Sequence, residues 1–83
     1  MTTVILFTKA GCGLCDEVKH KLEAIQATYP HQLREIDITQ DKVLFAKYRY
    51  MIPVVQIGEQ ELAAPITAVQ LQSTLKNQAN SSL

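Results

Sequence analysis

The order of apolar and polar positions along the chain predicts an α/β domain. Residues 4–7 are all apolar, a pattern typical of a strand buried on both faces. From about residue 12 to residue 28, apolar residues recur three or four positions apart, which predicts a helix with one buried stripe. That stripe consists of Leu14, Val18, Leu22 and Ile25. The Tyr29-Pro30 pair should end this helix, since a residue before proline avoids the helical region.

The middle of the chain predicts an edge strand followed by a short helix. Residues 33–38 mix polar and apolar positions, which suits an edge strand, and the preceding helix implies that this strand runs parallel to residues 4–7. Thr39 should cap a short helix that has Asp41 in its first turn. The apolar side of this helix would consist of Leu44, Phe45 and Tyr48, with Tyr48 in the core.

The last third of the chain predicts a hairpin and a final helix. Residues 54–57 and 60–63 read as two strands joined by a tight turn at Gly58-Glu59. Thr67 and Gln70 have the spacing of a capping box, which should open a helix with a stripe of small and apolar residues. That stripe consists of Ala68, Leu71 and Leu75.

These elements give the order βαβ-α-ββα, which predicts a four-stranded mixed sheet flanked by helices. At 83 residues the chain should form one domain. We place this domain at residues 1–77. Residues 78–83 are polar or small apart from the last, and we expect them to form a flexible C-terminal tail.

Charge and composition narrow the expected partners. Eight basic and eight acidic residues give a net charge of zero, so electrostatics offer no argument for binding nucleic acid or a membrane surface. No apolar run approaches the roughly 20 residues of a membrane-spanning helix, and no secretory signal pattern is visible. Two cysteines three positions apart are not a secreted disulfide framework, which needs pairs distant in sequence. We therefore expect a monomer in the cytoplasm.

Cys12 and Cys15 are the only cysteines, and they lie at the junction between the first strand and the first helix. A Cys-x-x-Cys pair can close a disulfide here with little rearrangement of the chain. The unpaired amides of the helix N-terminus favour a thiolate at Cys12, and the thiolate is the nucleophile of thiol–disulfide exchange. Cys12 should therefore attack, and Cys15, one turn further and nearer the core, should resolve the mixed disulfide. Lys9 would add positive potential near Cys12, or be an ordinary solvated charge.

A second motif, taken with the cysteine pair, gives the chain a resemblance to a known family. Ile52-Pro53-Val54 places a proline at the head of a buried strand, where its missing amide costs the sheet least. With Cys12-Gly13-Leu14-Cys15 and the element order, the chain resembles the thioredoxin-like fold, and most of all the small glutaredoxin-like proteins, over about residues 3–77. The resemblance implies that Pro53 follows a cis peptide bond and lies against the active-site disulfide. It also implies that Ile52 presents its backbone to the incoming thiol or disulfide. Gly13 and Leu14 are further expected substrate contacts.

The resemblance implies a dithiol oxidoreductase that reduces disulfides on a protein or on a low-molecular-weight thiol, with oxidation as the alternative direction. No organic cofactor is expected, because the cysteines themselves carry the electrons; glutathione is a candidate co-substrate. Glutaredoxins that use glutathione typically carry a Gly-Gly turn and an aspartate before the last helix. Residues 62–67 contain neither, which predicts weak use of glutathione. The electron donor stays unassigned.

Three alternatives remain open at this stage. A structural zinc site would need two further ligands, and His31 lies at the far end of the first helix while His20 sits among surface charges. No metal site is therefore expected. A soft-metal chaperone of the ferredoxin-like type also places Cys-x-x-Cys between a strand and a helix, but its order is βαββαβ. The third alternative is a non-catalytic thioredoxin-like interaction module, in which Tyr50 and Met51 could line a docking groove.

Overall fold

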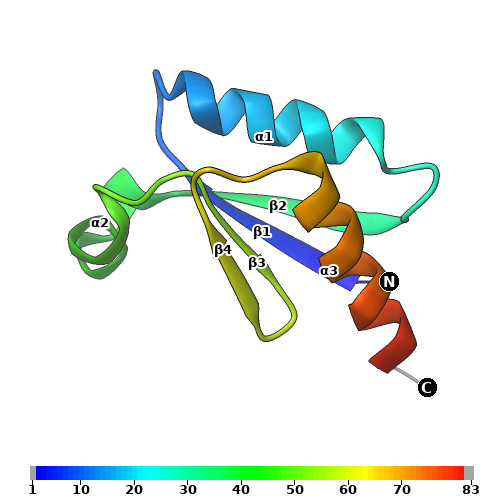
Figure 1. The fold of residues 1–83 in the computed structure, drawn as a ribbon. Helices are drawn as coiled ribbons and strands as arrows, with labels where there is room; N and C mark the ends of the chain where they lie inside the picture. Colours follow the sequence, from blue (N-terminus) through cyan, green and yellow to red (C-terminus); the bar gives the residue numbers. More distant parts are fainter. Residues whose placement is uncertain (1, 82–83) are drawn as a thin grey trace.

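The computed structural model of the protein describes residues 2–81 and has the predicted order of elements (Figure 1). The elements are β1 (Thr2–Thr8), α1 (Gly13–Ala24), β2 (His31–Asp37), the 3₁₀ turn η1 (Ile38–Gln40), α2 (Lys42–Tyr48), β3 (Val54–Ile57), β4 (Gln60–Ala63) and α3 (Ala68–Ser81). This order differs from the βαββαβ order on which the soft-metal alternative depended. No helix in the described part of the chain is long and apolar enough to cross a membrane.

The four strands form one mixed sheet in the order β2-β1-β3-β4. β1 pairs with β2 in parallel and with β3 in antiparallel, and β3 pairs with β4 in antiparallel. The predicted edge position of the second strand and its parallel pairing are therefore confirmed. The Gly58-Glu59 turn closes the hairpin as expected, with Gly58 at a φ of 60°, where glycine has no steric cost.

Two apolar cores cover the two faces of the sheet. α1 and α3 pack on one face around Leu6, Leu22 and Leu71, and both helices lie on the same side of the sheet in Figure 1. The other face holds a smaller core of Phe7, Ile38, Tyr48 and Val54. The uniformly apolar β1 thus contributes alternate residues to the two cores, as its sequence predicted.

The first helix begins at the cysteines as predicted, but its end and the exposure of its first turn differ from the prediction. α1 ends at Ala24, and residues 25–28 continue as turns, so the proline at position 30 does not set the helix end. Ile25 still packs in the core. Leu14, in contrast, is 60% exposed, although the sequence placed it in the buried stripe. It lies in the first turn of α1, and the buried residues of the stripe begin at Val18.

The region around residue 40 also corrects the prediction. Thr39 does not cap α2; it lies inside η1, where its amide and hydroxyl both donate to Asp37. Asp41 is itself the N-cap of α2, accepting from the amides of Val43 and Leu44. Of the residues predicted on the apolar side of α2, only Tyr48 is fully buried, while Phe45 is 36% exposed.

The last helix begins as predicted and ends later. The amide of Thr67 donates to the Gln70 side chain at 2.8 Å, and the amide of Gln70 donates to the Thr67 hydroxyl at 3.1 Å. This is the predicted capping box. α3 continues to Ser81, so residues 78–81 of the expected tail are helical, and residues 82 and 83 lie outside the described residues.

Candidate active site

The junction between β1 and α1 holds both cysteines. Gly11 has a φ of 78°, a left-handed conformation that turns the chain from the end of the strand into the helix. Cys12 is the N-cap of α1 with extended backbone angles, and its carbonyl accepts the amide of Asp16 at 3.2 Å. The sequence therefore places Cys12 where the helix leaves amide donors unpaired.

Cys12 and Cys15 are joined by a disulfide, with their Cα atoms 5.2 Å apart. The amide of Cys15 donates to the sulfur of Cys12 at 3.2 Å. The two residues differ in exposure, because Cys12 is partly exposed while Cys15 is only 1% exposed. A reagent from solvent can therefore reach Cys12 more easily, and a thiolate there would keep an amide donor and the positive end of the helix dipole.

The loop before β3 is held at the end of α2. The carbonyl of Tyr48 accepts the amides of Met51 at 2.8 Å and of Ile52 at 3.1 Å, and the ring of Tyr48 stacks on Phe7 with centroids 4.5 Å apart. The peptide bond between Ile52 and Pro53 is cis, and Pro53 is less than 2% exposed. These contacts tie the proline loop to the strand that leads into the cysteine pair.

A cavity of about 380 Å³ includes in its lining Leu14, which stands between the two cysteines in sequence. It lies between the first turns of α1, the proline that heads β3, and the loop between β4 and α3. Its lining residues are Leu14, Glu17, Val18, Lys21, Pro53, Ala64, Pro65 and Ile66. The ammonium of Lys21 donates to the carbonyl of Ile66 at 3.0 Å, which fixes the loop to α1. The structure thus brings Leu14 and Pro53 together on one cavity.

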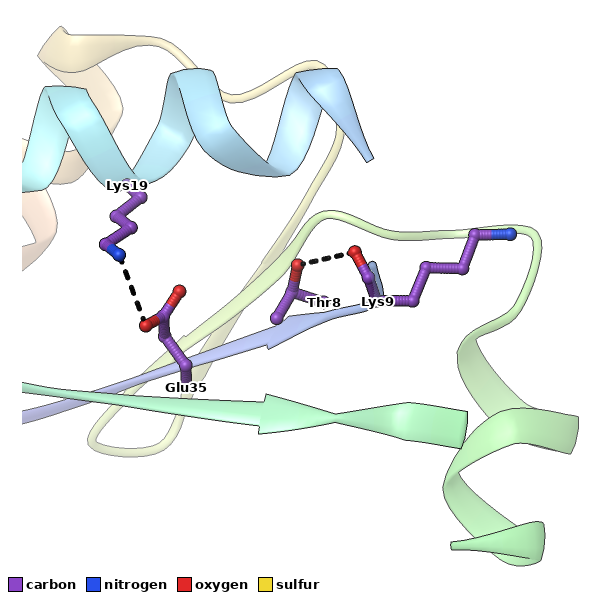
Figure 2. Close-up of polar contacts among 4 residues, drawn as sticks. All are labelled: Thr8, Lys9, Lys19 and Glu35. Carbon is purple, nitrogen blue, oxygen red and sulfur yellow. Dashed lines mark hydrogen bonds and ion pairs between the residues drawn. The ribbon is translucent and has the colours of Figure 1, made fainter. Parts of the chain in front are cut away.

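The other predicted contacts lie apart from this cavity. Gly13 is exposed at the start of α1, and Ile52 packs its side chain on the smaller core. Lys9 is exposed, and its side chain extends away from Thr8 at the end of β1 (Figure 2). Tyr50 and Met51 are 87% and 42% exposed and do not line the cavity.

Sequence reasoning missed the half of the cavity that comes from the loop between β4 and α3. Pro65 follows a second cis peptide bond and lines the cavity with Ile66. Lys21 is one of the polar positions of the first helix, and its sequence context gives no sign of its contact with this loop. Its acceptor, the Ile66 carbonyl, lies 45 residues away in sequence and could not be found from helical spacing.

Polar contacts elsewhere stabilise the frame around the site. Lys19 of α1 forms an ion pair with Glu35 of β2 at 3.5 Å, and the Thr8 hydroxyl donates to the Lys9 carbonyl at 3.5 Å (Figure 2).

His31 is buried at the start of β2, where its Nδ1 lies 2.7 Å from the Tyr29 carbonyl. Among the residues that the structure describes, no three His, Cys, Asp or Glu side chains group as metal ligands.

Among the residues that the structure describes, Asp37 and Lys47 have shifted pKa values, and both lie outside the cysteine pair. Hydrogen bonds from the Thr39 hydroxyl and amide hold the pKa of Asp37 below its ordinary value. Interaction with the Tyr48 side chain, aided by the Glu61 carboxylate, raises the pKa of Lys47. Tyr48 also donates to Glu61 at 3.2 Å, which links α2 to β4.

The sheet order, the helices and the cysteine pair at the head of α1 define a thioredoxin-like protein with a disulfide at its candidate active site. Residues 3–76 match the family model of the glutaredoxin-like domain (DUF836), and the chain belongs to that family.

Solved structures agree with this fold. A structural genomics target protein, XcR50 from X. campestris, is 27% identical with a TM-score of 0.75, covering 89% of this chain and 96% of that chain. Protein Ne2328 from Nitrosomonas europaea is 21% identical with a TM-score of 0.75, covering 87% of this chain and 88% of that one. Thioredoxin O2 from Arabidopsis thaliana, in its oxidised state, is 22% identical with a TM-score of 0.70, covering 93% of this chain and 74% of that chain. The last two likenesses concern the fold alone.

Proposed function

We propose that the protein is a thiol–disulfide oxidoreductase that uses Cys12 as nucleophile and Cys15 as resolving thiol. The observation that carries this proposal is the asymmetry of the pair. Cys12 is partly exposed at the N-cap and receives the Cys15 amide at 3.2 Å, whereas Cys15 is 1% exposed. Membership of the glutaredoxin-like family supports the same redox chemistry.

The reaction begins with both cysteines reduced. The Cys12 thiolate attacks one sulfur of a substrate disulfide, a mixed disulfide forms, and the other substrate sulfur leaves as a thiolate that takes a proton from water. Cys15 then loses its proton and attacks the Cys12 sulfur, which releases the second substrate thiolate. Two electrons have moved from the pair to the substrate. An external thiol reductant must then reduce the Cys12–Cys15 disulfide by the same steps in reverse.

Substitution of each cysteine tests these roles. Cys12→Ser should abolish reduction of a substrate disulfide, while Cys15→Ser should accumulate mixed disulfides that mass spectrometry detects at Cys12. Full activity of Cys12→Ser, or accumulation of mixed disulfides on Cys15 of Cys12→Ser with none on Cys12 of Cys15→Ser, would contradict the assignment. A double variant without either cysteine gives the background rate.

The redox potential of the pair decides the direction of exchange. Reference members of the superfamily span about −270 to −120 mV, from reductants to oxidants. Equilibration with a dithiol buffer of known potential would place this pair on that scale. We propose reduction of protein or low-molecular-weight disulfides in the cytoplasm, and this requires a value near the reducing end. A value near the oxidising end would reverse the direction and leave the cysteine roles intact.

A further inference from the structure

α2 exposes one of its sides to solvent, on the face of the sheet opposite to α1 and α3. Its inner side packs Leu44 and Tyr48 on the smaller core, and in Figure 1 this helix lies apart from α1 and α3. Its outer side carries aromatic and cationic residues together. Phe45 is 36% exposed, and Tyr50, just after the helix, is 87% exposed. We define the α2 face as the exposed residues Lys42, Phe45, Arg49 and Tyr50.

Arg49 is the centre of the α2 face. Its guanidinium lies over the ring of Tyr50, 4.6 Å from the centroid, and over the ring of Phe45 at 5.9 Å. These rings orient the planar guanidinium before any partner binds. No carboxylate in the described part of the chain pairs with it, since the ion pair found there joins Lys19 to Glu35. The N–H fork of Arg49 is therefore available for a planar acceptor with two oxygens, such as a carboxylate.

Charge is unevenly distributed around the α2 face. Residues 42–58 contain three basic residues and no acidic residue. Since the whole chain has eight of each, the rest of it has five basic and eight acidic residues and a charge of −3. Two acids contact the helix, and both are engaged. Asp41 accepts the amides at the start of α2, and Glu61 accepts the Tyr48 hydroxyl. The α2 face therefore favours an anionic partner.

The composition of the α2 face favours a protein over other anionic partners. Anionic membranes are recognised by clusters of about four to eight Lys or Arg. Nucleic acids are bound through many phosphate contacts. The α2 face has two cations, Lys42 and Arg49, together with two aromatic rings. Arg and Tyr are enriched among the residues that contribute most to binding between proteins. A carboxylate on a protein segment therefore fits this face best.

We propose that the α2 face is a docking site for an acidic segment of a partner protein. A carboxylate of that segment pairs with the fork of Arg49, and Lys42, two helical turns away, adds a second positive charge. An aliphatic neighbour in the segment packs on Tyr50 and Phe45. None of these four residues lines the cavity or belongs to the cysteine pair. The inference goes beyond the proposed function, and neither depends on the other.

Titration with short peptides, followed by ¹⁵N–¹H NMR spectra of the oxidised protein, tests this site. The probe is a cysteine-free peptide of Glu, Asp and Leu, and the control peptide has Gln and Asn in place of the acids. We expect the acidic peptide to shift the amide signals of residues 42–51. It should bind about fivefold more tightly than the control peptide, the upper range for an exposed ion pair. Its affinity should fall as salt is added, because salt screens exposed charges.

Matched variants locate the contact. Arg49→Gln should remove most of the difference between the two peptides, while Arg34→Gln, at an exposed position on β2, should keep it. Arg49→Lys keeps the charge but loses the planar fork, so it should recover only part of the difference. Tyr50→Ser should weaken the binding of both peptides, while Val69→Ser, exposed on α3, should not. The dispersion of each spectrum shows that the variant is folded.

Other outcomes would overturn the proposal. Equal binding of the acidic and control peptides, or binding of neither at millimolar concentration, would exclude recognition of an acidic segment. Signal shifts confined to residues 11–18 would place the peptide at the cysteine pair. A difference that survives in Arg49→Gln would refute the role of the fork. Tighter binding to phosphatidylserine vesicles than to the acidic peptide would assign the face to a membrane surface. None of these results bears on the roles of the cysteines, which the cysteine variants test separately.

Discussion

The difference in reactivity between the two cysteines can be worked out from the structure. A hydrogen bond to a charged group contributes about 1.5–3 kcal/mol, and the partial exposure of Cys12 favours the lower end. An energy of about 1.5 kcal/mol raises the thiolate population roughly tenfold. A stabilised thiolate is also less nucleophilic, and about half of this logarithmic gain remains, or roughly three- to fourfold. Since Cys15 is 1% exposed, it also needs a local opening before it reacts.

Together these effects predict that Cys12 of the reduced protein alkylates about tenfold faster than Cys15 at neutral pH. The assay measures iodoacetamide labelling of Cys12→Ser and Cys15→Ser, each of which keeps one thiol, with quantification by mass spectrometry. The same measurement in concentrated urea is the control, where the two rates should become nearly equal. A native ratio below about threefold, or a ratio that survives in urea, would refute the argument from the helix N-terminus and burial.

Three further predictions concern the frame of the site. Pro53→Ala should raise the KM for a peptide disulfide more than it lowers kcat, and an unchanged KM would contradict the role of Pro53. Absorbance of this variant after addition of iron and sulfide tests whether its thiols recruit an iron–sulfur cluster. Thr67→Ala should lower the free energy of unfolding in urea by about 1 kcal/mol, since it breaks the capping box, while Thr74→Ala should change it by less than about 0.5 kcal/mol. Thr39 lowers the pKa of Asp37 in the folded state, so the Asp37 carboxylate stabilises the fold at pH values above its ordinary pKa of 3.8. This stabilisation is lost as the pH falls through the lowered pKa. The Tm difference between wild type and Asp37→Ala should therefore be present at neutral pH and disappear in acid.

Local patterns predicted the elements that have a strong periodic signal. The uniformly apolar β1 had to be central, and the mixed polarity of residues 33–38 placed β2 at the edge. The Thr67–Gln70 spacing located the start of α3, because a capping box needs only neighbouring residues. The region near residue 40 was predicted less well. Asp37 and Asp41 both cap short helical segments there, and the sequence alone does not say which acid caps which turn.

Helical periodicity also fails at the active site for a physical reason. Leu14 keeps the spacing of the buried stripe of α1, but it lies in the first turn, at the mouth of the cavity formed with the loop between β4 and α3. Helical spacing sets only the face of a helix, so Leu14 can be in phase with the core and still be 60% exposed. Helical spacing therefore identifies the face of α1 on which Leu14 lies, and only the folded structure shows that the core does not cover this first turn.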